Sequence, residues 1–212
     1  MSSVPLNAGG ATKAAAVMLF AGFAGFGAGA VNLAIAASLL LAPASGAGAG
    51  AGAPPDTALS AAAGAAAGIW GCALLGWTVL TLRKGRMPWA AGTMAVLVAA
   101  ALVHAAAAAG PGLNGQSLNG QSLNGRSLVI SHLAALLLTL MIAAAAGWLR
   151  RQGTGADTAG LRPGRLLLSA FGFAVLVAAV ATPGVAASTA GQFAVPHGSH
   201  GIPAPGGQHH GH

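Results

Sequence analysis

Five long apolar segments alternate along the chain with short polar or glycine-rich stretches. A helix needs about 20 apolar residues to cross about 30 Å of hydrocarbon. Segments of about that length or longer occupy residues 14–42, 58–82, 89–109, 128–149 and 166–186. They are rich in alanine and lack the period-two alternation of a membrane β-strand. The pattern predicts an all-α fold, an integral membrane bundle of five transmembrane helices within residues 1–187, with Pro183 expected to kink or end the fifth helix.

The stretches between these segments have the composition of loops. Residues 113–127 hold three copies of a five-residue repeat, LNGQS twice and then LNGRS. Its Asn-Gly pairs favour turns, so we expect a flexible loop here, with a binding loop as the alternative. Residues 188–212 are rich in glycine, proline and histidine and have no core-forming pattern, which predicts a disordered tail.

The composition identifies the class of protein. Hydrophobic residues make up 55% of the chain and charged residues 5%, whereas a soluble domain has about 25% charged residues. Such a chain cannot cover its surface in water, so a soluble enzyme is excluded. The single cysteine, Cys72, cannot form an intrachain disulfide or a cysteine zinc cluster.

The cations are distributed unevenly about the predicted spans. Eight of the nine Lys and Arg residues would lie on one side and only Arg126 on the other; the eight are Lys13, Arg83, Lys84, Arg86, Arg150, Arg151, Arg162 and Arg165. Because cytoplasmic loops carry the excess of Lys and Arg, we expect a cytoplasmic N-terminus, an outside C-terminus and a multi-pass location in the cell (plasma) membrane. This distribution accounts for the net charge of +7 without nucleic acid as a partner, and some cations could also contact lipid headgroups.

The first apolar segment could also be a signal peptide, because a basic residue precedes it and Ala42-Pro43-Ala44 resembles a cleavage site. The apolar core of a signal peptide is about 7–15 residues long, and this segment is much longer. We therefore expect a retained helix. Cleavage would leave four helices.

Small residues recur at every fourth position in the first two segments. They are Ala21, Gly25 and Gly29 in the first, and Ser60, Gly64, Gly68, Cys72 and Gly76 in the second. Small residues let membrane helices approach closely, so we expect these two ridges to pack together, with Cys72 in the seam. For Asn32, the only amide in the first segment, we expect a hydrogen bond to another helix, with substrate contact as the alternative.

The histidines are the most unusual feature, seven against only two acidic residues. Five of them, His197, His200, His209, His210 and His212, lie in the tail. Imidazole is a good ligand for Cu(II), Zn(II) and Ni(II), and a mobile chain can chelate without a preformed pocket. The alternative is a solvated polar tail without a metal role.

The other two histidines fall inside predicted spans. His104 precedes the outer end of the third and His132 follows the outer start of the fourth, each roughly 6–8 Å below the boundary. Ionisable residues in a membrane mark functional sites by default. A shared metal or ligand site requires the two rings to face the bundle interior within about 3–4.5 Å, a spacing that suits two nitrogen ligands of one metal ion. A tail histidine, water or a substrate would have to complete that site. The alternative is a neutral histidine bonded to a backbone carbonyl or to Ser131.

Two short segments, Leu102-Val103-His104 and Ser131-His132-Leu133, resemble a pattern found in a group of known membrane proteins. This arrangement resembles small multi-pass membrane proteins of high-GC bacteria, which are rich in Ala and Leu and place a His late in one helix and a His-Leu pair at the start of the next. Some His-rich relatives look like copper-handling accessory proteins. The resemblance covers the third and fourth spans and implies no established activity. The Asn-Gly repeat and the C-terminal histidines depart from that pattern.

These observations lead to two functional hypotheses. The first is a non-enzymatic membrane protein that binds Cu, Zn or Ni on the outer face as a metal-handling accessory. The second is a structural or accessory subunit of a larger membrane complex, with other membrane subunits as partners. An enzyme is not expected, because the only side-chain carboxylates, Asp56 and Asp157, would lie on opposite sides of the bilayer and paired carboxylates must be close.

Overall fold

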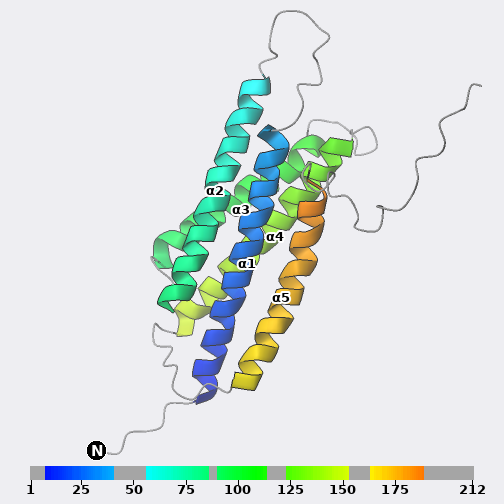
Figure 1. Ribbon diagram of the computed structural model, residues 1–212. Helices are drawn as coiled ribbons and strands as arrows, with labels where there is room; N and C mark the ends of the chain where they lie inside the picture. The colour runs from blue at the N-terminus through cyan, green and yellow to red at the C-terminus, as the bar shows by residue number, and fades with distance from the viewer. Residues whose placement is uncertain (1–7, 41–55, 86–89, 114–122, 153–162, 189–212) are drawn as a thin grey trace, which may run out of the picture.

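The computed structural model is all-helical and contains five helices within the residues it describes (Figure 1). They are α1 (Ala8–Leu40), α2 (Asp56–Lys84), α3 (Ala90–Leu113), α4 (Leu123–Gln152) and α5 (Pro163–Ala186). The described residues are 8–40, 56–85, 90–113, 123–152 and 163–188. All five helices are long and apolar enough to cross a membrane. The predicted number, type and order of elements are therefore confirmed.

Two helices extend into residues that were predicted to be a loop. The third copy of the repeat begins α4 at Leu123, and α3 continues to Leu113. Asn-Gly pairs are tolerated there because the first four N–H groups of a helix have no helical acceptor in any case. Pro183 lies inside α5, which ends three residues later at Ala186. The possible cleavage site at residues 42–44, most of the repeat and the histidine tail lie outside the described residues.

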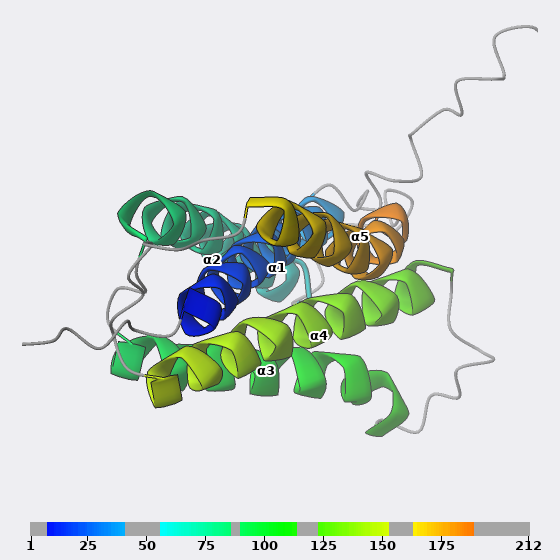
Figure 2. The same cartoon turned by 90° about the horizontal axis from the view of Figure 1, so that it is seen from below.

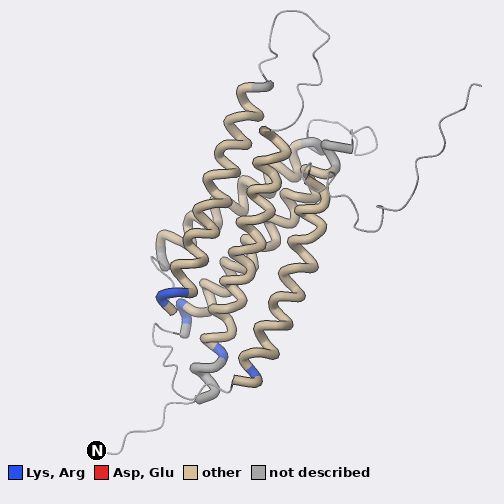
Figure 3. Tube along the Cα trace, viewed as in Figure 1, with Lys and Arg blue, Asp and Glu red and all other residues tan. Residues whose placement is uncertain are grey.

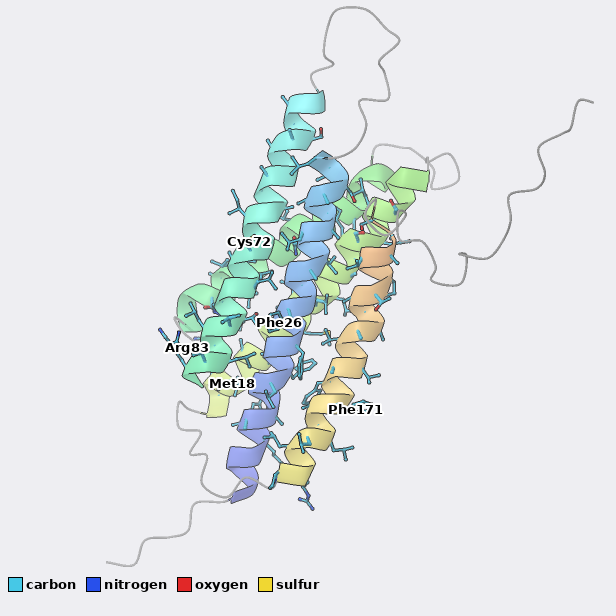
Figure 4. All side chains as sticks on the ribbon, viewed as in Figure 1. Met18, Phe26, Cys72, Arg83 and Phe171 are labelled. Carbon is cyan, nitrogen blue, oxygen red and sulfur yellow. The ribbon has the colours of Figure 1, made fainter. Side chains whose placement is uncertain are left out.

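The helices form two layers, with α2, α1 and α5 in one and α3 and α4 in the other (Figure 2). The helix α1 is central and packs against α2, α4 and α5, whereas α3 packs substantially only against α4. The hydrophobic core follows this arrangement. Ala28, Val31 and Ile35 of α1 are fully buried and belong to one hydrophobic cluster with Leu138 and Ile142 of α4. The outer faces of α2, α3 and α5 expose large apolar side chains, of which Phe171 is an example (Figure 4).

The closest helix pairing is between α1 and α2, as the small-residue pattern predicts. A Cβ atom added to Gly71 would lie 2.9 Å from the carbonyl oxygen of Gly29, and one added to Gly29 would lie 3.1 Å from the carbonyl oxygen of Gly71. A Cβ at Gly25 would overlap Thr78, and one at Gly64 would lie 2.9 Å from Leu40. The two backbones are thus in near contact at several levels, which only glycine permits.

The seam on α2 differs from the predicted one. At the glycines of the two helices, the α2 positions that lie close to α1 are 64, 68, 71, 75, 78 and 82, and their spacing alternates between four and three residues. This is the heptad seam of a left-handed antiparallel pair, whereas a strict four-residue ridge drifts around the helix. Cys72 is exposed on α2 (Figure 4), and a Cβ at Gly76 would meet nothing within 4 Å. The prediction that Cys72 and Gly76 belong to the seam is therefore wrong.

Asn32 is also placed differently from the expectation. Its Nδ2 donates to the carbonyl oxygen of Ala28 in its own helix at 2.9 Å. Its Oδ1 is buried and has no hydrogen-bond partner among the described residues. The expected bond to another helix is absent from that part of the chain, because the residue opposite Asn32 is Gly71, which has no side chain to donate one.

All the Lys and Arg residues whose side chains the structure describes belong to segments at one end of the bundle (Figure 3). They are Lys13, Arg83, Lys84, Arg150, Arg151 and Arg165. Arg126 falls in the first turn of α4, at the opposite end. Because successive helices run in opposite directions, alternate helix ends meet on the same side of the bundle. One end is therefore basic, and the other has few charges.

Candidate metal centre

His104 and His132 come from the last turns of α3 and the first turns of α4, at the end of the bundle opposite the basic side chains. His104 lies six residues before Gly110 and His132 five residues after Ser127, the ends of the two apolar spans. At 1.5 Å per residue they lie about 9 Å and about 7.5 Å inside those ends. Because α3 and α4 are antiparallel neighbours, the two residues reach the same level.

The two imidazole rings are in contact. The Nδ1 atoms of His104 and His132 are 3.2 Å apart, and the ring centroids are 5.5 Å apart with the planes tilted by 44°. His104 is buried at 5% exposure, and His132 is half-buried. The proximity that a shared site requires is therefore present. A metal role for the pair remains a proposal.

The distance between the Nδ1 atoms is compatible with two chemical states. In the first, one neutral ring donates its Nδ1–H to the lone pair on the other Nδ1, a hydrogen bond of ordinary length. In the second, both Nδ1 lone pairs bind one metal ion. Two nitrogens at ~2.0–2.1 Å from tetrahedral zinc are about 3.3–3.4 Å apart, so the pair would have to open only slightly. Two protonated rings are not compatible with this contact, because both Nδ1 atoms would then carry a hydrogen.

Ser131 fixes the start of α4, although it does not bond to a histidine. Its Oγ donates to the carbonyl oxygen of Gly184 in α5 at 2.8 Å and approaches that of Ser127 at 3.1 Å. At the same junction, a Cβ at Gly184 would lie 2.7 Å from the Cβ of Ala134. The alternative in which Ser131 holds His132 is not what the structure shows. Instead, α5 holds the helix that presents His132.

Among the described residues, the side chains at this site that could bind a metal are those of His104 and His132. No cluster of three or more His, Cys, Asp or Glu side chains forms among them. Cys72 lies on the exposed face of α2, and Asp56 begins α2, whereas Asp157 falls in the undescribed range 153–162. The five tail histidines, His197, His200, His209, His210 and His212, also lie outside the described residues. The α5 helix does end on the same side as the histidine pair (Figure 1).

The structure also contains a feature that the sequence patterns did not predict, a crevice between α2 and α3. It is lined by Trp70, Ala73, Leu74 and Trp77 of α2 and by Gly92, Thr93, Val96 and Leu97 of α3. The spacing of Trp70 and Trp77 by one heptad places them on one face of a helix. That spacing does not tell whether the face meets another helix, lipid or a crevice.

Comparison with known proteins identifies no relative of this chain. No protein-family model, no curated protein and no solved structure matches the chain.

Proposed function

We propose that this chain is a multi-pass protein of the cell membrane that binds a transition metal ion on its extracytoplasmic side and acts as a metal-handling accessory. The metal ligands are His104 and His132 together with the tail histidines at 197, 200, 209, 210 and 212. The N-terminus is cytoplasmic and the C-terminus lies outside. The observation that carries the proposal is the 3.2 Å contact between the Nδ1 atoms of His104 and His132.

Membrane insertion and orientation are supported by length, composition and charge. The chain has five apolar helices, and the described Lys and Arg residues lie at one end of the bundle (Figure 3). This is the distribution of cations in a membrane protein with that end in the cytoplasm. The histidine pair and the C-terminal end of α5 then lie on the outer side.

The metal role is supported by the chemistry of the pair. Burying two imidazoles in an apolar bundle is unfavourable unless they have partners, and here each is the other's partner. Neutral imidazole is the form that binds Cu(II), Zn(II) and Ni(II). The pair leaves at least two coordination positions of a tetrahedral ion open. The five histidines of residues 197–212 would fill them, so that ions are captured outside and passed to the pair.

A second candidate function rests on the same distance. An Nδ1–H···Nδ1 hydrogen bond needs no metal, and it would tie α3 to α4, the one helix against which α3 packs substantially. In that case the chain is a structural or accessory subunit of a larger membrane complex, and the pair only holds α3 in place.

Metal titration by calorimetry distinguishes the two functions. The proteins to compare are the full chain, a truncation after Ala194, the double variant His104→Ala/His132→Ala, and both changes together. For the metal-handling function, Cu(II) or Zn(II) binds the full chain, truncation removes most but not all of the heat, and the combined variant binds nothing. Binding that is absent from the full chain, or unaffected by the loss of the pair in the truncated chain, would contradict a metal site at His104 and His132.

The orientation has its own test with reporter fusions. A reporter that is active only outside the cytoplasm should give signal when fused to residue 212 and none when fused after Lys84. The reversed pattern would place the histidines in the cytoplasm and remove the extracytoplasmic role.

A further inference from the structure

The crevice between α2 and α3 separates two helices that are neighbours in sequence but have little contact. It has a volume of about 490 Å³, within the ~300–1,000 Å³ range of small-molecule pockets. Its lining is almost entirely apolar, and Trp70 and Trp77 are two of the four α2 residues that line it. On the α3 side, Gly92 contributes no side chain, and a Cβ there would meet nothing within 4 Å.

The position of the crevice in the bundle indicates what fills it. The stretches that line it, residues 70–77 and 92–97, belong to the half of the bundle near the basic end. Trp77 lies six residues before Arg83, about 9 Å along the helix axis. Arg83 and Lys84 are exposed in the last turn of α2. Along α2, the apolar lining of the crevice is thus followed within about 9 Å by a pair of cations at the end of the apolar span.

We propose that this crevice is a binding site for an anionic phospholipid. One acyl chain lies between α2 and α3 against Trp70 and Trp77, and the phosphate group lies at Arg83 and Lys84. A protein helix fits less well, because a crevice of this volume holds a chain of methylene groups but not a helix about 10 Å across. Basic sites beside transmembrane helices on the cytoplasmic side commonly bind anionic headgroups. This site lies at the opposite end of the bundle from the histidine pair and is independent of any metal.

Tryptophan fluorescence tests the proposal directly. In the variant Trp89→Phe/Trp148→Phe, the only indoles left are the two that line the crevice. The protein is placed in nanodiscs of unlabelled phosphatidylcholine that contain a small fraction of acyl-brominated phosphatidylglycerol or, as the control, acyl-brominated phosphatidylcholine. Bromine quenches an indole only on contact, so a bound anionic lipid gives more quenching than the zwitterionic lipid at the same mole fraction.

Two sets of variants locate the acyl chain and the headgroup. Gly92→Leu places a large side chain in the lining of the crevice, where an added Cβ meets nothing within 4 Å, and the matched control Gly76→Leu adds the same side chain to an equally open position of α2 outside it. Arg83→Gln/Lys84→Gln removes the two cations, and Arg165→Gln is its control on α5. We expect Gly92→Leu to abolish the excess quenching. The α2 double variant should lower the preference for the anionic lipid by up to about thirtyfold, because each of the two basic residues contributes about 1 kcal/mol near a headgroup.

Three results would overturn the proposal. The first is equal quenching by the two brominated lipids in the parent protein. The second is an excess that survives Gly92→Leu or is lost equally in Gly76→Leu, which would place the lipid elsewhere. The third is no quenching by either lipid in a protein that crosslinks as a dimer through α2 and α3, because a second copy of the chain would then cover the crevice.

Discussion

The close approach of α1 and α2 at Gly71 gives the most quantitative prediction. The change is Gly71→Leu, compared with Gly76→Leu and Gly68→Leu on the same helix. At Gly71 the Cβ alone would lie 2.9 Å from the carbonyl oxygen of Gly29, and a backbone atom cannot rotate away. At Gly68 the nearest atom is the Cβ of Ala36 at 3.5 Å, an ordinary contact, and at Gly76 there is open space.

The expected energies follow from these distances. Overpacking a tight site costs typically about 1–3 kcal/mol, and Gly71→Leu should reach or exceed the upper end because α1 and α2 must separate to admit it. Replacing glycine in a helix interior gains about 0.5–1 kcal/mol, so Gly76→Leu should be neutral or slightly stabilising. Gly68→Leu should fall between them, because its first carbon fits and its branched end does not.

Equilibrium unfolding in mixed micelles measures this series, with helix content followed by circular dichroism as denaturing detergent is added. The expected order of unfolding free energy is Gly76→Leu at or above the parent, then Gly68→Leu, then Gly71→Leu. If Gly71→Leu and Gly76→Leu unfold at the same point, the α1–α2 seam is not where the structure puts it. If Gly76→Leu is the most destabilised, the strict four-residue ridge is the packing face after all.

Two further substitutions test single polar groups by the same unfolding assay. Asn32→Leu removes a buried Oδ1 that has no partner among the described residues, so stability should stay equal or rise, by up to about 1–3 kcal/mol; a clear loss would mean that Oδ1 binds something in the native protein. Ser131→Ala removes the bond to the carbonyl oxygen of Gly184 and should cost about 0.6–1.7 kcal/mol. Its control, Ser169→Ala, loses only a bond within α5 and should be close to neutral, so equal effects of the two serine variants would contradict a role of Ser131 in joining α4 to α5.

The number, order and type of the helices could be predicted from the sequence because lipid imposes a simple length requirement. About 20 apolar residues must be helical to satisfy their backbone hydrogen bonds in hydrocarbon. The proximity of His104 and His132 followed from the same reasoning, since equal depth on antiparallel neighbours brings two residues to one level. Equal depth does not determine the direction in which each ring points, which depends on the rotation of each helix about its own axis.

The packing faces could be predicted only in part. In a chain this rich in Ala and Gly, both a four-residue ridge and a heptad seam can be drawn through the same helix, and Gly64 and Gly68 belong to both. The heptad seam continues through Gly71 and Thr78 and includes larger residues that a search for small side chains does not select. The central position of α1 has no local signal either, because every span is apolar on all sides and the choice of partner depends on long-range packing.

The crevice between α2 and α3 could not be predicted from the sequence, because it too depends on long-range packing. It exists because α3 packs on α4 and leaves α2, and no pattern within either helix encodes that separation. At the start of α4, by contrast, a local pattern is present but predicts the wrong structure, because the helix begins at Leu123. The Asn124-Gly125 pair favours a turn, which predicts a loop, but the first turn of a helix tolerates such a pair.

Zinc K-edge X-ray absorption on the purified chain loaded with one equivalent of Zn(II) tests the metal site most directly. If His104 and His132 are ligands, the first shell contains nitrogen at ~2.0–2.1 Å with imidazole scattering behind it. The chain truncated after Ala194 should then retain two imidazoles per zinc, and adding His104→Ala/His132→Ala to the truncation should leave none. An imidazole count that falls to zero on truncation alone would contradict the account, because the pair would then be only a hydrogen bond between α3 and α4.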